Sequence, residues 1–244
     1  HSCIRRAVER GQLNADPGPP TPRGRGRRKV NQPKNAVDVR RLPSPAAAAA
    51  IIAAMKSHQP GSLTYQAMTA VVYYAGLRPS EVVMLRPRAL VLPQSGWGRI
   101  AVTEADVGWD EPGDPKTGSR STRPPPGLVR LLGEWIERRR LVDDELMFRS
   151  ARGNRPSQSN WSRALKRACV AAGHRRIRVY DFRHAYATTM IRAGVPLAEA
   201  ARRLGHSVET LVSTYIGAMD GDDVEANALI ERALGAHARI SGDA

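Results

Sequence analysis

The spacing of hydrophobic and polar residues predicts a chain built mainly from amphipathic helices. Over residues 127–139, large apolar side chains recur three or four positions apart and share one helical face: Leu128, Leu131, Leu132, Trp135 and Ile136. Further helices are predicted over residues 46–55, 64–75, 157–172, 181–193, 196–204, 207–218 and 222–236, and a short one begins at Pro79. Some runs start at a capping serine or end at a glycine, as Ser44 and Gly76 do for the first two.

Helical spacing is lost between Arg99 and Pro125. Ile100 and Val102 alternate with polar residues there, and glycine and proline recur along the segment. Alternation with a period of two is typical of a strand that is buried on one face. We therefore predict a mostly α (α+β) fold with a small antiparallel β-sheet, whose turn lies near residues 113–118.

Residues 1–42 differ in composition from the rest of the chain. Residues 17–22 are rich in proline and cannot hold a helix or a central strand. Five basic residues, spaced by glycines, follow over positions 23–29. This composition is typical of a flexible basic linker, although an ordinary disordered tail fits it equally well. Order is expected from about Ser44, which divides the chain into residues 1–42 and 43–244.

Length, charge and cysteine content limit the class of protein. The 244 residues suffice for one large domain, and a hydrophobic content of 41% provides its core. The formal net charge of +15 favours nucleic acid as a partner, although a solvated basic surface also accounts for it. Two distant cysteines argue against a disulfide framework or a zinc site and fit a reducing cytosol. No apolar run approaches the roughly 18–20 residues of a membrane span, so we expect a cytoplasmic protein without a membrane partner.

Five side chains in four short segments offer the groups that phosphodiester transfer without a metal requires. The reaction needs a nucleophile, cations that hold the charge of a five-coordinate phosphorus, and an acid for the leaving oxygen. Arginine suits the second task because its planar fork grips two phosphate oxygens and stays charged. Each candidate alone has an ordinary structural explanation, but the set in this order is hard to attribute to chance: Arg78, Lys116, Arg183, His206 and Tyr215.

The order of these residues resembles the active site of the tyrosine recombinases, which include the phage integrases. Residues 75–85 (AGLRPSEVVML) are similar to the family's first arginine box, A-G-L-R-x-S-E-x-x-x-L. Residues 180–184 (YDFRH) resemble the second box, H-x-L-R-H. Residues 204–207 (LGHS) resemble the L-G-H-S signature, and Tyr215 follows His206 by nine positions.

The resemblance implies a role for each of the five residues. Tyr215 would attack the scissile phosphate and form a 3′-phosphotyrosyl intermediate. Arg78 and Arg183 would clamp the non-bridging oxygens, and His206 would donate a hydrogen bond to the same phosphate. Lys116 would protonate the leaving 5′-oxygen. The reaction would need no metal, no ATP and no other cofactor.

One position departs from the family pattern. Tyr180 stands where the family usually has histidine and sometimes lysine, a residue thought to help move the proton of the nucleophile. Tyrosine has an unperturbed pKa near ~10 and is a poor base at neutral pH, although its hydroxyl could hydrogen-bond a phosphate oxygen. His184 directly follows Arg183, so we expect it to point about 100° away and to pack inside rather than replace that base. The carboxylates of Glu81 and Asp181 are expected to orient arginines or to cap helix starts.

The resemblance runs from about Ser44 to the C-terminus and also implies partners. Double-stranded DNA would be the substrate, and four protomers would assemble on paired sites, with a monomer in the absence of DNA. Residues 222–236 would either be exchanged with a neighbouring protomer or fold onto their own domain. Residues 3–12 resemble the final helix of the core-binding domain that precedes the catalytic domain, so the chain is expected to be part of a longer protein, and most of that domain would be absent from it.

Two other functions stay open at this point. A type IB topoisomerase shares the chemistry but needs no second duplex. A DNA-binding protein that has lost activity would keep the fold, and Tyr180 is the feature that favours this alternative. Basic runs at residues 138–140 and 175–178 would either line the DNA or simply be solvated.

Overall fold

A computed structural model of the chain describes residues 36–56, 61–106, 112–116, 118–150, 152–219 and 223–234. The expected basic linker and the helix expected over residues 3–12 lie outside the described residues. Among the described residues, no helix combines the length and the apolar character that a membrane crossing requires.

The described helices lie where the hydrophobic spacing predicts them, with ends shifted by at most a few residues. Ser44 caps the first by accepting a hydrogen bond from the Ala47 amide, and Gly76 ends the second in the left-handed conformation with φ 69°. The α-helices are α2 (Pro45–Ala54), α3 (Ser62–Ala75), α4 (Pro79–Val82), α5 (Pro126–Arg139), α6 (Gln158–Ala171), α7 (Val179–Arg192), α8 (Leu197–Leu204), α9 (Val208–Met219) and α10 (Asp223–Leu234).

The segment between residues 99 and 125 forms antiparallel strands, as predicted. Strands β2 (Arg99–Val102) and β5 (Arg120–Thr122) pair with each other, and Ile100 lies opposite Thr122. A further strand that the alternation did not reveal, β1 (Leu90–Val91), extends the sheet to the order β1-β2-β5. Between β2 and β5, the short strands β3 (Ala105–Asp106) and β4 (Pro112–Gly113) pair with each other. The mostly α fold with a small antiparallel sheet is therefore confirmed.

Residues just before Ser44 also pack against the helices. Val39–Arg41 form a 3-10 helix, and the Val37 amide donates a hydrogen bond to the Thr214 carbonyl of α9 at 2.8 Å. The side chains of Val37 and Val39 also pack against a hydrophobic cluster of α7, α8 and α9. Two valines among polar residues give no periodic pattern, so the local sequence does not predict that this segment packs against the helices.

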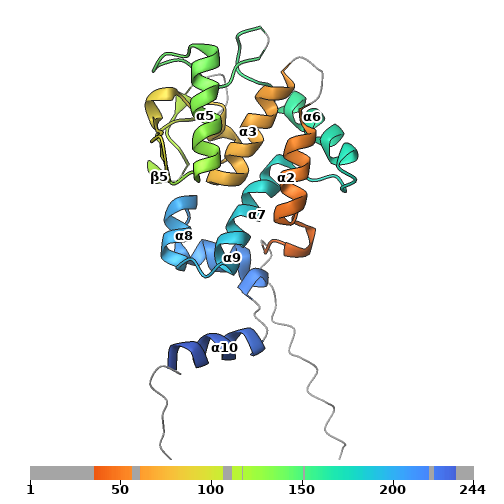
Figure 1. The fold of residues 1–244 in the computed structure, drawn as a ribbon, viewed down its shortest axis with the longest axis vertical. Helices are drawn as coiled ribbons and strands as arrows, with labels where there is room; N and C mark the ends of the chain where they lie inside the picture. Colours follow the sequence, from red (N-terminus) through yellow and green to blue (C-terminus); the bar gives the residue numbers. More distant parts are fainter. Residues whose placement is uncertain are drawn as a thin grey trace, which may run out of the picture. The chain divides into compact units, whose positions relative to one another are not determined.

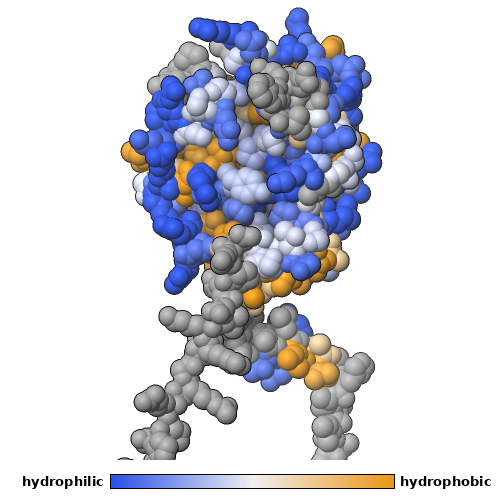
Figure 2. All heavy atoms as spheres, turned by 180° about the vertical axis from the view of Figure 1, so that it is seen from behind, coloured by the Kyte–Doolittle hydropathy of each residue, from blue (hydrophilic) through white to orange (hydrophobic). Residues whose placement is uncertain are grey.

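Helix α3 lies at the centre of the helical arrangement. It packs against α2, α5, α6 and α7, and Figure 1 shows α5 on one side of it and α2 and α6 on the other. Helices α7, α8 and α9 pack against one another, and α8 and α9 lie below α3 and α5 in the view of Figure 1. Helix α8 also contacts β5. The face drawn in Figure 2 is mostly hydrophilic, with smaller hydrophobic areas, as expected for a strongly basic chain.

The apolar interior consists of two clusters that share α7. Phe182 and Ala185 face the larger cluster, which α2, α3, α4, α5, α6 and the sheet also build. Ala187 and Met190, further along the same helix, face the smaller cluster with α8 and α9. The first turns of α7 therefore lie where both clusters meet the C-terminal ends of α3 and α8, and the candidate residues converge at this junction.

Candidate active site

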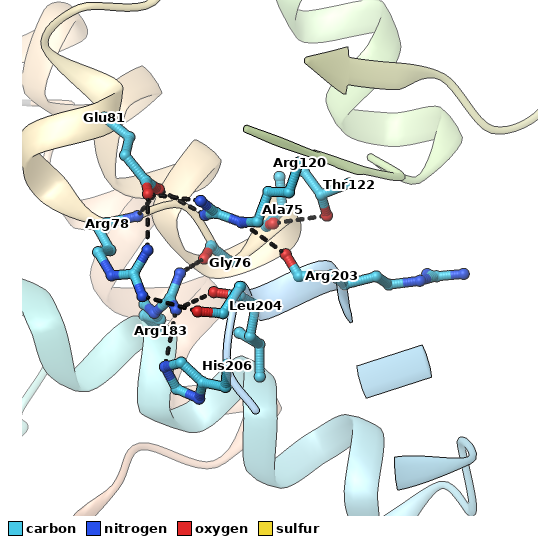
Figure 3. A network of polar contacts seen from close by, with 11 residues as sticks. Ala75, Gly76, Arg78, Glu81, Arg120, Thr122, Arg183, Arg203, Leu204 and His206 are labelled. Atoms are coloured by element: carbon cyan, nitrogen blue, oxygen red, sulfur yellow. Dashed lines mark hydrogen bonds and ion pairs between the residues drawn. The ribbon is translucent and has the colours of Figure 1, made fainter. Parts of the chain in front are cut away.

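Arg183 is fully buried at the junction of α3, α7 and α8. Its Nη1 donates to the Gly76 carbonyl and its Nη2 to the Leu204 carbonyl, and Nη2 also lies 3.1 Å from His206 Nε2 (Figure 3). Both carbonyls belong to helix C-termini, where the helix dipole favours positive charge. Burial, followed by the nearby charge of Arg78, lowers the pKa of Arg183 to about 10, so the guanidinium stays protonated at neutral pH.

Arg78 meets Arg183 at the end of α8. Its Nη2 donates to the Gly205 carbonyl at 3.0 Å, next to the Leu204 carbonyl that Arg183 binds. The Arg78 backbone amide and Nη1 bind the Glu81 carboxylate at 2.7 and 2.9 Å, which fixes Arg78 at the start of α4. The guanidinium groups of Arg78 and Arg183 thus bind neighbouring carbonyls at the end of α8 (Figure 3).

The Glu81 carboxylate is buried and accepts hydrogen bonds from a second arginine that sequence analysis missed. Arg120 of β5 binds both carboxylate oxygens at 2.6 Å, and its Nε donates to the Arg203 carbonyl at 3.1 Å. Burial raises the pKa of Glu81, but the hydrogen bonds and charge of Arg120 and the Arg78 amide outweigh it and leave the pKa below its usual value. Glu81 therefore orients Arg78, as expected, and ties it to the sheet.

His206 follows α8 directly and is held in the neutral form. Burial, and then the charges of Arg183 and Arg78, lower its pKa to about 3. Its Nε2 faces the Nη2 donor of Arg183, so the ring proton belongs on Nδ1. Within the described part of the chain, His206 Nδ1 and Arg183 Nε are buried and have no hydrogen-bond partner. Two donors in this cluster are thus available for an acceptor.

Tyr215 lies in α9 and is buried in the smaller hydrophobic cluster. Its ring stacks beside that of His206, with centroids 6.4 Å apart and an angle of 22° between the planes. Its backbone leaves the helical region, with φ −115° and ψ 21°, and so kinks α9 at this residue. Burial raises the pKa of the Tyr215 phenol well above its ordinary value, against the opposing effect of Arg183. The phenol is therefore neutral in this state.

His184, which we expected to pack inside, contacts the hydroxyl of Tyr215. Its Nδ1 lies 2.8 Å from the Tyr215 oxygen. His184 follows Arg183 in the helix and so points about 100° away from it, as we expected. That direction faces α9, because α7 packs against α9. Tyr180 lies one turn before His184 and sets its ring edge against the imidazole, at 4.8 Å between centroids. The spacing of Tyr180 and His184 by four residues was the signal that could have revealed this pair.

Lys116 is not part of this cluster in the structure. It is exposed in the segment between β4 and β5, and no contact among the described residues joins it to the arginines. Asp181 acts as expected and caps α7, since it accepts hydrogen bonds from the Arg178 amide at 2.8 Å and from the Arg178 guanidinium. No cluster of three or more metal-ligating side chains occurs within the described ranges.

Comparisons with known proteins identify a family and several relatives. The model of the phage integrase family covers residues 44–221. The integrase of Mycobacterium phage D29 is 30% identical over 112 residues, which are 43% of this chain and 30% of that protein. The putative prophage phiRv2 integrase of Mycobacterium tuberculosis (strain ATCC 25618 / H37Rv) is 31% identical over 176 residues, 69% of this chain and 46% of that protein. This chain thus spans less than half the length of either relative.

Solved structures share the fold at low sequence identity. The XerH site-specific recombinase bound to its difH substrate superposes with a TM-score of 0.60 and 20% identity, covering 78% of this chain and 53% of that one. The Tn1549 transposon integrase in complex with transposon right end DNA gives a TM-score of 0.63 and 16% identity, covering 79% and 65%. With the family model matching most of its length, the chain belongs to the phage integrase family.

Proposed function

We propose that this chain cleaves and rejoins DNA as the catalytic part of a site-specific recombinase, with Tyr215 as the nucleophile. The observation that carries the proposal is the convergence of Arg78, Arg183 and His206 at the end of α8, with the Tyr215 ring stacked on His206. Two fixed cations and a neutral imidazole beside a phenol are the groups that a metal-independent phosphotyrosyl transfer requires.

The arginines are held in place before any DNA binds. Arg78 is fixed by Glu81 and Gly205, and Arg183 by the carbonyls of Gly76 and Leu204. A cluster oriented in advance stabilises a developing phosphorane charge without the cost of reorganisation. Arg183 Nε and His206 Nδ1, which have no partner in the described part of the chain, supply donors for the non-bridging oxygens.

Cleavage begins when the Tyr215 oxygen attacks phosphorus and the bond to the 5′-oxygen breaks. The charges of Arg78 and Arg183 favour the phenolate that attacks. Because Tyr215 is fully buried in this state, the phenol has to become accessible to the phosphate, and the kink of α9 at this residue is the natural place for that change. Lys116, exposed between β4 and β5, is the proposed donor of a proton to the leaving 5′-oxygen.

Double-stranded DNA is the proposed partner, with four protomers on paired sites and a monomer in its absence. The net charge of +15 suits a polyanion, and the relatives named above include recombinases solved with DNA. Helix α10 exposes the apolar side chains of Ile230 (54%) and Leu234 (61%), which suits a segment that is exchanged between protomers. We place the reaction in the bacterial cytoplasm, on the nucleoid, without a metal or nucleotide cofactor.

A nicked duplex tests the assignment of the nucleophile. When the strand beyond the scissile phosphate is short, it diffuses away after cleavage and the covalent protein–DNA adduct accumulates. A pool of such duplexes with varied sequence should yield an adduct with the wild-type protein and none with Tyr215→Phe. Tyr65→Phe, which removes the same hydroxyl at the start of α3, is the matched control and should form the adduct. An unchanged adduct with Tyr215→Phe would refute the proposal, and relaxation of plasmids without joining of paired sites would favour a topoisomerase.

A further inference from the structure

We propose that His184 accepts the proton of Tyr215 as the phenol attacks the phosphate, and is thus a catalytic residue of this enzyme. The inference rests on the proposed function, since it assumes that Tyr215 is the nucleophile. Its basis is the direct contact between His184 Nδ1 and the Tyr215 oxygen, at 2.8 Å. This distance is within the range in which a general base takes a proton without an intervening water.

The imidazole of His184 contacts two aromatic rings. The Tyr180 ring lies edge-to-face with it, at 4.8 Å between centroids and an interplanar angle of 70°. The Tyr215 ring is also edge-to-face with it, at 5.6 Å and 61°. Such edge-to-face contacts restrict the rotation of a ring and hold Nδ1 toward the phenol in this state.

The protonation state of His184 suits an acceptor. Burial, together with the charges of Arg183 and Arg178, lowers its pKa to about 4, against the opposing effect of Asp181. The ring is therefore neutral near pH 7. With its proton on Nε2, it presents the lone pair of Nδ1 to the hydroxyl of Tyr215.

Neighbouring groups are less well placed for this role. His206 uses Nε2 to face Arg183, and its ring stacks on Tyr215 without a hydrogen bond to the hydroxyl among the described contacts. The Tyr180 ring contacts the imidazole of His184, and no hydrogen bond between Tyr180 and the Tyr215 hydroxyl occurs among the described contacts. His184, one turn after Tyr180, is therefore the group that is placed to accept the proton of the Tyr215 phenol.

The step balances with Lys116 as the proposed proton donor. The O–H bond of Tyr215 breaks and its proton moves to His184 Nδ1, while the electron pair of the oxygen forms the new bond to phosphorus. The bond from phosphorus to the 5′-oxygen breaks, and that oxygen takes its electron pair and a proton from Lys116. Because the phenolate pair is consumed as it forms, a weakly basic imidazole suffices. In the rejoining step, His184 returns the proton to the departing phenol.

The variant His184→Asn distinguishes a role of His184 in proton transfer from a role in positioning Tyr215. The amide of Asn lies close to where the Nδ1 atom of histidine lies, so His184→Asn keeps a hydrogen bond to Tyr215 but cannot accept its proton. We expect this variant to form the adduct on the nicked duplex about 10²-fold more slowly than wild type in single turnover. His184→Ala should be at least as slow, and His174→Asn, the same change in the segment that follows α6, should react at the wild-type rate.

A sulfur atom in place of the scissile 5′-oxygen identifies which proton transfer is lost. A thiolate leaves without protonation, so this substrate should rescue Lys116→Ala but leave His184→Asn slow. Wild-type rates for His184→Asn, or its rescue by sulfur, would overturn the role of His184. Equal unfolding midpoints of His184→Asn and wild type exclude misfolding as the cause. The proposed function stands or falls separately, on whether wild-type protein forms an adduct that Tyr215→Phe does not.

Discussion

Removing Arg120 should destabilise the protein strongly, because it leaves the buried carboxylate of Glu81 short of its main partner. Arg120 and Glu81 have side-chain exposures of 5% and 1%, and two hydrogen bonds of 2.6 Å join them. Breaking a buried pair by deleting one partner typically costs about 3–5 kcal/mol, since the remaining charge stays desolvated. We expect Arg120→Met to lower the free energy of unfolding by this amount, which is a large share of the roughly 5–15 kcal/mol that stabilises a typical domain.

Urea unfolding followed by tryptophan fluorescence measures this loss, because Trp161 is buried in the larger cluster. Arg138→Met is the matched control. Arg138 pairs with Glu134 on the surface of α5, with exposures of 77% and 57%, and such pairs contribute about 1 kcal/mol at most. A second variant, Arg120→Met with Glu81→Gln, should lose less than the sum of the single changes. If Arg120→Met costs no more than Arg138→Met, the reasoning about the buried pair is wrong.

Two further predictions concern the same junction. Gly76→Ala should destabilise the protein by more than ~1–2 kcal/mol, because φ is 69° and the new Cβ would lie 2.6 Å from the Tyr186 ring. Gly133→Ala, in open space within α5, should stabilise the protein by about 0.5–1 kcal/mol in the same urea assay. Equal effects of the two substitutions on the free energy of unfolding would contradict this prediction. The folded-state pKa values of His184 and His206 are about 4 and about 3, so the unfolded state binds more protons below pH 6.5 and the free energy of unfolding should fall from pH 6.5 toward pH 4. Unfolding of His184→Asn at pH 7, 5.5 and 4.5 should show a shallower decline than wild type, and an identical decline would exclude a buried neutral His184.

Local sequence was sufficient for the helices and for the two arginines of the cluster. Helix ends follow from groups that act within one turn, such as the Ser44 hydroxyl on the Ala47 amide. Arg78 was recognisable by its place in the first arginine box and by the order of the candidates along the chain. Arg183 was recognisable by its motif, but its complete burial and its carbonyl partners depend on where α3 and α8 end.

The remaining contacts join residues that are far apart in the chain. Arg120 binds Glu81 across 39 positions, and His184 meets Tyr215 across 31. A helical angle gives the direction of His184 relative to Arg183 but not which helix lies in that direction. Only the packing of α7 on α9 determines that the neighbour is the phenol.

Identification of the DNA-linked residue tests the central claim most directly. Trypsin should release residues 204–232 as one peptide, because Arg203 precedes it and Arg232 is the next cleavage site, and Tyr215 is the only tyrosine within it. After trapping on a nicked duplex and nuclease digestion, mass spectrometry should find this peptide carrying a 3′-linked nucleotide, with fragmentation placing the added mass on Tyr215. A nucleotide on any other side chain, or a trapped adduct whose peptide is unmodified, would contradict the account.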